Sequence, residues 1–202
     1  MRFFYLVSIS ILLFFTNIFS SEQILAVRLG LGYNDFIGKD LKASTKGGFT
    51  WSCGFLGAQP ISDGKYYWGV ETNFSQRFSS FDTTSWNENT GVYDKKAKGK
   101  FHGEYIDLAF FTGRKFLRNF FIYAGPQVSY MLSSSKNIAG KKTASDDDFS
   151  PFQAEIQAKL MYYFHESFAI DFKYSQSFLP IDSYGQLKIY GQIFNLGFLY
   201  IF

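Results

Sequence analysis

The 202-residue chain has one cysteine and two histidines, and this scarcity narrows its chemistry. With Cys53 alone, the chain cannot form an intrachain disulfide or a cysteine-based metal site. The sequence also lacks a Gly-rich phosphate loop, a dinucleotide-binding fingerprint and any repeat of solenoid length. Its formal net charge of +3 is too small to indicate a nucleic-acid partner. We therefore expect no cofactor and no binding of nucleic acid.

Long apolar runs are also scarce. One run follows Arg2 and extends from Phe3 to Phe15, interrupted only by Ser8 and Ser10. It is shorter than the ~20 residues of a spanning helix and leads into small and polar residues, so it predicts a signal peptide over residues 1–20. An uncleaved N-terminal anchor is the alternative. In residues 21–202, the predicted mature domain, no segment approaches ~18 consecutive apolar residues.

Aromatic side chains, in contrast, are abundant. They make up 21% of the chain, with 26 Phe and 14 Tyr. A soluble domain of this length could hardly bury so many, so the composition favours a protein whose surface lies in lipid. Because no second membrane helix is available, strands are the remaining way to cross.

Apolar and polar residues alternate in eight segments, as expected for strands with one face in an apolar environment. In residues 152–164, for example, the even positions are apolar or aromatic, while Gln153, Glu155, Gln157 and Lys159 occupy odd positions. The eight segments are residues 26–36, 48–59, 65–78, 102–114, 119–133, 152–164, 168–178 and 189–202. The sequence predicts an all-β fold: an eight-stranded antiparallel transmembrane β-barrel with outer-membrane lipid on its outside.

The predicted connections alternate in length. Residues 60–64, 115–118 and 165–167 form short links, whereas residues 37–47, 79–101, 134–151 and 179–188 form longer polar ones. Barrels of the bacterial outer membrane have short periplasmic turns and longer extracellular loops. We therefore expect an integral outer-membrane protein with both chain ends on the periplasmic side.

The last segment ends in an aromatic residue. Phe194, Leu196, Phe198, Tyr200 and Phe202 are large and apolar and share one face. We expect this segment to be the closing strand, with Phe202 as the signal that the barrel-insertion machinery recognises.

Charged residues on the inward positions predict a polar network in the lumen. Four are cations and four are anions, so a narrow lumen can satisfy its charges by pairing. They are Arg28, Glu71, Arg77, Asp107, Glu155, Lys159, Asp171 and Lys173. We expect this network to hold the barrel shut; a narrow path for ions or small solutes is the alternative.

Few residues suggest catalysis or metal binding. His102, with Ser79, Ser80 or Ser85, would allow a lipid-modifying site at the extracellular rim, but no spacing carries such a signature. His165 lies in a short turn, and the acidic residues 146–148 lack the other features of a calcium loop. We therefore expect a protein that is not an enzyme and has no metal site.

The run from Phe121 to Leu132 contains Ala124, Gly125 and Pro126, followed by Tyr130 near its end. Proline inside a strand cannot donate a ladder hydrogen bond, so we expect a bulge or irregularity there. With the first strand around Val27 and the aromatic end, this run resembles the PorT-like outer-membrane β-barrel proteins abundant in Bacteroidetes. Ser129 and the fourth strand around Asp107 depart from the family pattern.

The founding member of that family is linked to the export of secreted proteins across the outer membrane. The resemblance therefore implies a structural or interaction-mediating barrel, with envelope or secretion-system proteins as partners through the extracellular loops. Because a fold does not transfer a function, the channel and the lipid-modifying enzyme stay open as alternatives.

Overall fold

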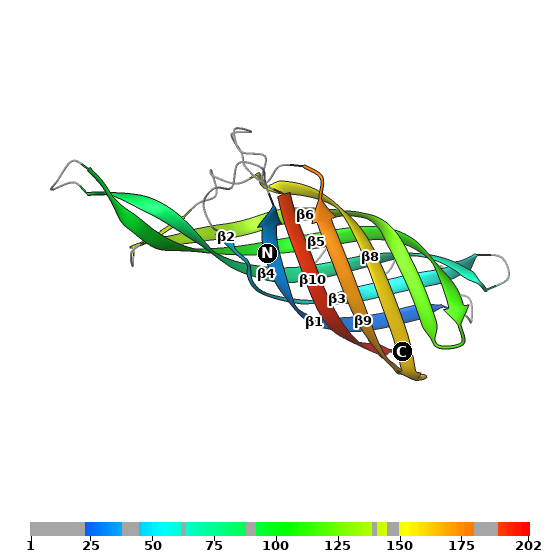
Figure 1. Ribbon diagram of the computed structural model, residues 1–202. Helices are drawn as coiled ribbons and strands as arrows, with labels where there is room; N and C mark the ends of the chain where they lie inside the picture. The colour runs from blue at the N-terminus through cyan, green and yellow to red at the C-terminus, as the bar shows by residue number, and fades with distance from the viewer. Residues whose placement is uncertain are drawn as a thin grey trace, which may run out of the picture.

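Eight long antiparallel strands form a closed barrel in the computed structural model, which describes residues 23–37, 45–61, 64–87, 92–138, 141–144, 150–179 and 190–202. Short connections gather at the end where the C-terminus lies, called the turn end here, and the opposite end is the loop end (Figure 1). The eight barrel strands are β1 (Ile24–Ile37), β3 (Gly48–Ile61), β4 (Tyr66–Asn87), β5 (Val92–Leu117), β6 (Phe120–Ile138), β8 (Phe152–His165), β9 (Phe168–Ser177) and β10 (Tyr190–Ile201).

The first and last strands close the barrel. β1 pairs with β10 in an unbroken register from Ala26 opposite Ile201 to Ile37 opposite Tyr190. On its other edge β1 pairs with β3, and β4 pairs with both β3 and β5. Closure removes the exposed sheet edges that would otherwise be open to lipid. The prediction of an eight-stranded antiparallel barrel is confirmed, with the last strand of the chain as the closing one.

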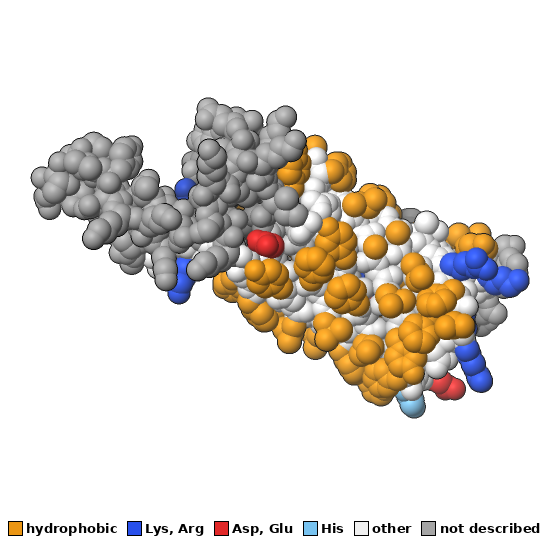
Figure 2. All heavy atoms as spheres, viewed as in Figure 1, with side chains coloured by type: hydrophobic (Ala, Val, Ile, Leu, Met, Phe, Trp, Pro, Cys, Tyr) orange, Lys and Arg blue, Asp and Glu red, His pale blue; other side chains and the backbone are white. Residues whose placement is uncertain are grey.

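Burial alternates along the strands, as the pattern of residue types predicts. In β8 the odd positions from Gln153 to Met161 are buried, whereas Ile156 and Leu160 are exposed on the outer surface. Apolar side chains cover this outer surface across several strands (Figure 2). An apolar exterior over a polar interior is the arrangement that a lipid environment favours.

The prediction of a loop over residues 79–101 is wrong for most of its length. β4 and β5 stay paired beyond the barrel as far as Asn87 opposite Val92, with one register shift between Thr84 and Ser85. This extension is the long two-stranded projection in Figure 1, and we call it the arm. Its polar composition suggested a loop, but Thr, Trp and Tyr in this stretch favour strands, and cross-strand hydrogen bonds form in water as well as in lipid.

Two shorter strands correct other predicted loops. β2 (Thr45–Lys46), within the loop expected at residues 37–47, pairs with β4 at Phe81 and Ser80. β6 runs past Ser133 to Ile138 and pairs with β7 (Lys141–Ala144), both within the loop expected at residues 134–151. The loop end is therefore more ordered than its composition indicates, because neighbouring strands supply partners for its backbone.

Pro126 interrupts pairing without shifting the register. Ala109 pairs with Gln127 and Thr112 with Ala124, but the two residues between them on β5 have no pairing recorded across from Pro126 and Gly125. On its other edge Pro126 pairs with Ile156 of β8. The expected irregularity is thus a local gap in the ladder on one edge. The register shift lies elsewhere, where Leu132 of β6 is an extra residue opposite the step from Glu104 to Tyr105 of β5. The buried face of β6 therefore changes from odd-numbered positions, ending at Met131, to even-numbered positions, beginning at Ser134.

The predicted signal peptide, residues 1–20, lies outside the described residues. No helix among the residues that the structure describes is long and apolar enough to span a membrane.

Candidate functional site in the barrel interior

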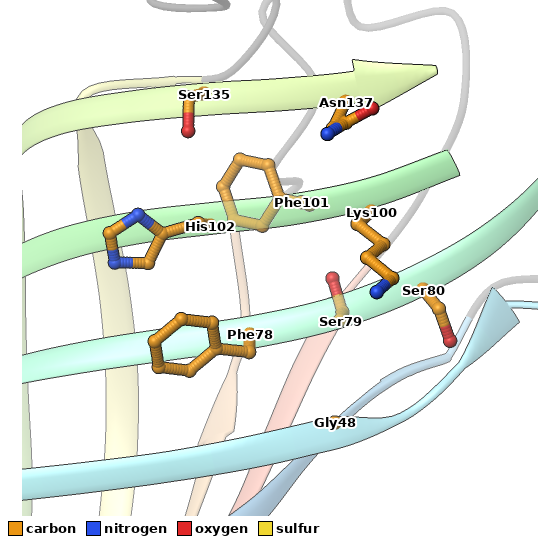
Figure 3. A pocket seen from close by; sticks show the side chains of 9 residues that line it. All are labelled: Gly48, Phe78, Ser79, Ser80, Lys100, Phe101, His102, Ser135 and Asn137. Atoms are coloured by element: carbon orange, nitrogen blue, oxygen red, sulfur yellow. The ribbon is translucent and has the colours of Figure 1, made fainter. Parts of the chain in front are cut away.

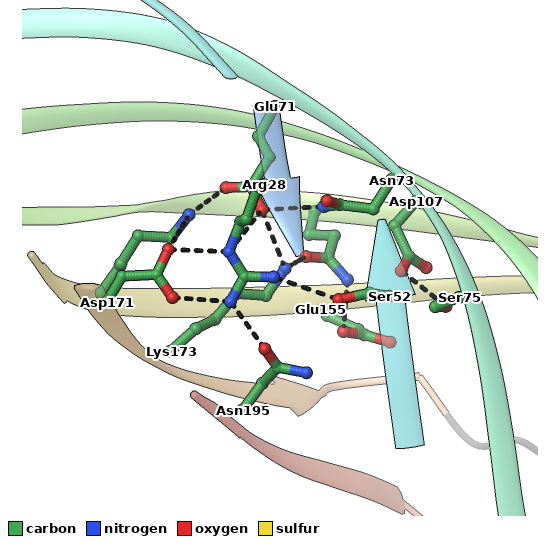
Figure 4. A network of polar contacts seen from close by, with 12 residues as sticks. Arg28, Ser52, Glu71, Asn73, Ser75, Asp107, Glu155, Asp171, Lys173 and Asn195 are labelled. Carbon is green, nitrogen blue, oxygen red and sulfur yellow. Dashed lines mark hydrogen bonds and ion pairs between the residues drawn. The ribbon is translucent and has the colours of Figure 1, made fainter. Parts of the chain in front are cut away.

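Arg28 of β1 makes four side-chain hydrogen bonds inside the lumen (Figure 4). Its Nε donates to Asp171 Oδ2 at 2.7 Å and its Nη2 to Asp171 Oδ1 at 2.6 Å. Nη2 also donates to Asn195 Oδ1 at 2.6 Å, and Nη1 to Ser52 Oγ at 3.1 Å. The Arg28 side chain is fully buried. Two parallel bonds to one carboxylate fix both groups in position as well as pairing their charges.

Glu71 of β4 is the anion shared by three cations. It accepts a hydrogen bond from Lys159 Nζ, and its Oε1 lies 3.6 Å from Lys173 Nζ and 3.8 Å from Arg28 Nε. Lys159 Nζ also lies 3.4 Å from Asp171 Oδ2. We call these five residues, Arg28, Glu71, Lys159, Asp171 and Lys173, the basic cluster, because three cations meet two anions.

Arg77 is the centre of a second group, nearer the loop end. Its guanidinium donates to Asp107 Oδ1 at 2.6 Å and to Glu155 Oε1 at 3.0 Å. It also lies over the Tyr105 ring, 4.2 Å from the centroid, so that a cation–π contact adds to the ion pairs. We call Arg77, Asp107 and Glu155 the acidic cluster, because one cation meets two anions.

Gln127 of β6 connects the two clusters. Its amide oxygen accepts a hydrogen bond from Lys173 Nζ at 2.9 Å, and its amide nitrogen donates to Glu155 Oε2 at 2.8 Å. The surplus cation of one cluster thus offsets the surplus anion of the other, joined by a neutral group. All eight charged residues expected in the lumen are placed inside the barrel, and the structure brings them together in these two linked groups.

Neutral side chains of the same network were missed because the sequence reasoning counted only charges. Ser129 receives a hydrogen bond from Arg77, Ser75 donates to Asp107, and Asn73 donates to Glu71. Their inward strand parity was the available signal. These residues form hydrogen bonds with the carboxylate oxygens and guanidinium N–H groups that the ion pairs leave without a partner. The extra bonds reduce the free-energy cost of burying the charges.

The turn end of the lumen is apolar, which the expectation of a polar interior did not include. Aromatic rings pack across it edge to face or tilted: Tyr67 and Phe121 have centroids 5.3 Å apart, Phe111 and Tyr123 4.9 Å, and Phe121 and Tyr163 4.9 Å. We call this layer the apolar plug, and its fully or nearly buried members include Ala26, Leu56, Met161 and Leu199. An eight-stranded barrel is just wide enough for such side chains to fill.

The residues weighed for catalysis are brought together only in part. Ser80 shares the outer face with His102 and lines the same cavity at the loop end, but no acidic side chain among the described lining residues completes a triad. The side chain of Ser85 lies outside the described residues. His102 lies on the outer face of β5 and stacks on Phe78, with centroids 4.6 Å apart. Ser79 is buried on the opposite, luminal face of β4, so the sheet lies between its hydroxyl and the imidazole. Within the described residues no group of three or more His, Cys, Asp or Glu side chains is arranged to hold a metal ion, and residues 146–148 lie outside them.

Comparison with family models matches residues 17–183 to the outer membrane protein beta-barrel domain. The chain belongs to this family. It is therefore an integral β-barrel of the bacterial outer membrane, with the turn end facing the periplasm and the loop end facing the exterior. No curated protein sequence matches the chain.

Solved structures give the same fold. Neisserial surface protein A (NspA) superimposes with a TM-score of 0.53 at 10% identity, covering 88% of this chain and 97% of that one. Ail, the attachment invasion locus protein of Yersinia pestis, gives 0.51 at 16% identity, covering 89% and 98%. At such low identity the likeness is one of architecture.

The basic cluster predicts a large stability difference between single and paired substitutions. Replacing Glu71 by Leu leaves three buried cations with Asp171 alone, so we expect the free energy of unfolding to fall by about 3–5 kcal/mol. Adding Lys159→Met removes a surplus cation, so the double variant should be more stable than Glu71→Leu. Urea unfolding of the detergent-solubilised barrel, followed by tryptophan fluorescence, measures both.

Glu166→Leu, at an exposed turn position, is the control and should change stability by no more than about 0.5 kcal/mol. A Glu71→Leu variant as stable as the wild type would show that the luminal charges are not balanced by this carboxylate.

Proposed function

We propose that the protein is a non-enzymatic outer-membrane barrel that anchors an extracellular arm for docking envelope or secretion-system proteins. The observation that carries the proposal is the length of the strands forming the arm. β4 has 22 residues and β5 has 26, whereas a transmembrane strand needs about 9–11 residues. At roughly 3.3 Å per residue, about half of each strand lies beyond the membrane.

The backbone edges of the arm favour contact with another chain. Among the described residues, β4 has no strand other than β5 beside it beyond Phe81, where β2 ends. On the other side, the pairing of β5 with β6 ends at Gly99 opposite Ile138, so in the part of the chain that the structure describes residues 92–98 lie beside β4 alone. Unpaired N–H and C=O groups on an edge strand are the template for strand addition by a partner.

The closed lumen supports a structural role over transport. The apolar plug and the paired charges fill the cross-section, and a role as anchor needs no open path. The proposed link to secretion rests on the resemblance of the run around Pro126 to PorT-like proteins. This resemblance indicates a class of pathway but does not identify a partner. We infer that residues 1–20 direct export and are removed before the barrel assembles.

Shortening the arm tests the docking role. In one variant, Asn-Gly replaces residues 81–99 and joins the opposed Ser80 and Lys100 by a two-residue hairpin turn. We expect chemical crosslinking of intact cells, followed by affinity capture, to lose envelope proteins that the wild type retains. The control replaces only residues 88–91 by Asn-Gly, which preserves both arm edges, and it should capture the wild-type set. Identical capture by all three proteins contradicts the proposal.

Electrical recording tests the channel alternative. Because the apolar plug and the ion pairs occupy the lumen, we expect the purified barrel in planar bilayers to give no single-channel steps. Current steps that change with Glu71→Gln or Asp171→Asn would instead assign the lumen to ion conduction.

Phe202 is proposed as the recognition signal for barrel insertion. It is the most exposed large apolar residue of the described chain, at 69%, and its ring lies 5.1 Å from that of Tyr200. We expect Phe202→Ala to lower the folded, heat-modifiable fraction in cells while refolding into lipid in vitro stays at the wild-type rate. Phe164→Ala, another exposed aromatic near the turn end, is the control. An equal defect in vitro would mean that Phe202 acts through stability.

A further inference from the structure

A cavity of about 460 Å³ lies at the loop end, beside the barrel wall formed by β4, β5 and β6 (Figure 3). Six of its lining residues are outward-facing on three adjacent strands: Phe78 and Ser80 of β4, Lys100 and His102 of β5, and Ser135 and Asn137 of β6. Gly48 of β3 and the inward-facing Ser79 and Phe101 complete the lining. Its volume is within the ~300–1,000 Å³ of small-molecule sites. Neither the luminal network nor the docking proposal uses it.

The strand register arranges these six residues in two rows. Phe78 is opposite His102, which is opposite Ser135; Ser80 is opposite Lys100, which is opposite Asn137. Ser135 and Asn137 face outward because the register shift opposite Leu132 reverses the parity of β6. Without that extra residue, Ser134 and Lys136 would occupy these places. The irregularity in β6 therefore supplies one wall of the cavity.

A row of hydrogen-bonded polar side chains crosses the outer surface just below the cavity. Trp51 Nε1 donates to Gln76 Oε1 at 2.9 Å, and Gln76 Nε2 donates to Glu104 Oε1 at 3.0 Å. Ser133 Oγ donates to Glu104 Oε2 at 3.0 Å. Such a polar row across four strands is compatible with the headgroup region but not with lipid tails. The cavity, one row farther out, is therefore at the level of headgroups or just above them.

The cavity lining is rich in donors and holds one aromatic wall. Lys100 and Asn137 are exposed, and no acidic side chain among the described residues lines the cavity. The His102 ring is stacked at 15° on Phe78, and its Nε2 is buried without a hydrogen-bond partner. A buried imidazole nitrogen without a partner is costly unless a ligand or water pairs with it.

We propose that this cavity binds a phosphorylated sugar. Lys100 is the charge partner for the phosphate, because an ammonium group binds phosphate oxygens as a compact charge. His102, Ser135 and Asn137 supply hydrogen bonds for sugar hydroxyls, and the exposed part of the Phe78 ring packs against the sugar ring. A divalent cation is disfavoured, since the described lining residues include a lysine and no carboxylate.

Two sources offer this chemistry: the headgroup of a phosphorylated glycolipid in the outer leaflet, and a soluble sugar phosphate. The position beside the polar row suits the first, because the sugar phosphate of an embedded lipid lies at that level. Calorimetric titration of the full barrel in detergent separates the two, with purified lipopolysaccharide and glucosamine 1-phosphate as probes and glucosamine as the comparator without phosphate.

The test variant is Lys100→Gln with His102→Phe, which retains an aromatic ring against Phe78. Loss of a charged contact and a hydrogen bond should weaken binding of the phosphorylated probes about tenfold or more. Lys65→Gln, an exposed lysine at the turn end, is the matched control and should bind as the wild type does. Heat-modifiable mobility in gels checks that every variant is folded.

Binding of lipopolysaccharide alone assigns the site to the glycolipid, and binding of glucosamine 1-phosphate assigns it to a sugar phosphate irrespective of the lipid. The proposal is overturned if neither probe binds the wild type, if glucosamine binds as tightly as its phosphate, or if the double variant binds like the wild type.

Discussion

Charge neutralisation in a space too narrow for bulk water is the constraint on which the rest of the structure depends. A closed eight-stranded barrel turns every second residue inward, so each strand contributes side chains that must satisfy one another. Arg28 meets this demand by bonding Asp171, Asn195 and Ser52 from three other strands. The network therefore links strands that are distant in sequence, in addition to the backbone ladders between neighbours.

The same alternation of residues produces both the interior and the exterior of the barrel. Apolar and polar side chains, however, are distributed differently along the barrel axis on each side. Inside, the apolar plug fills the turn end, and the two charged clusters follow toward the loop end. Outside, a hydrogen-bonded polar row of Gln76, Glu104 and Ser133 crosses the apolar surface, and the cavity lies one row farther out. The membrane-embedded part is thus closed and self-sufficient, which leaves the arm and the rim cavity as the parts able to meet other molecules.

The sequence was sufficient to predict which residues face the lumen and which face lipid, because this depends on strand parity. It was insufficient where the parity changes within a strand, or where polar residues form strands instead of loops. Alternation in residues 152–164 identified both the lipid face and Glu155 and Lys159 as inward residues. It did not reveal the bulge at Leu132, because the three serines that follow, Ser133 to Ser135, show no alternation that would mark the change of parity. The arm was missed because solvent-exposed strands and loops share polar residues. Gln127 was missed because a neutral amide becomes important only when the register places it between Lys173 and Glu155.

The separation of the two clusters has an electrical consequence. Lys159 and Glu155 are four residues apart on β8, roughly 13 Å along the strand. The cluster with a surplus cation lies nearer the periplasm, and the one with a surplus anion lies nearer the cell exterior. The eight luminal charges sum to zero but thus form a permanent dipole with a component along the barrel axis. Any voltage across the outer membrane exerts a torque on that dipole, so the barrel has an electrostatically preferred orientation as well as a topological one.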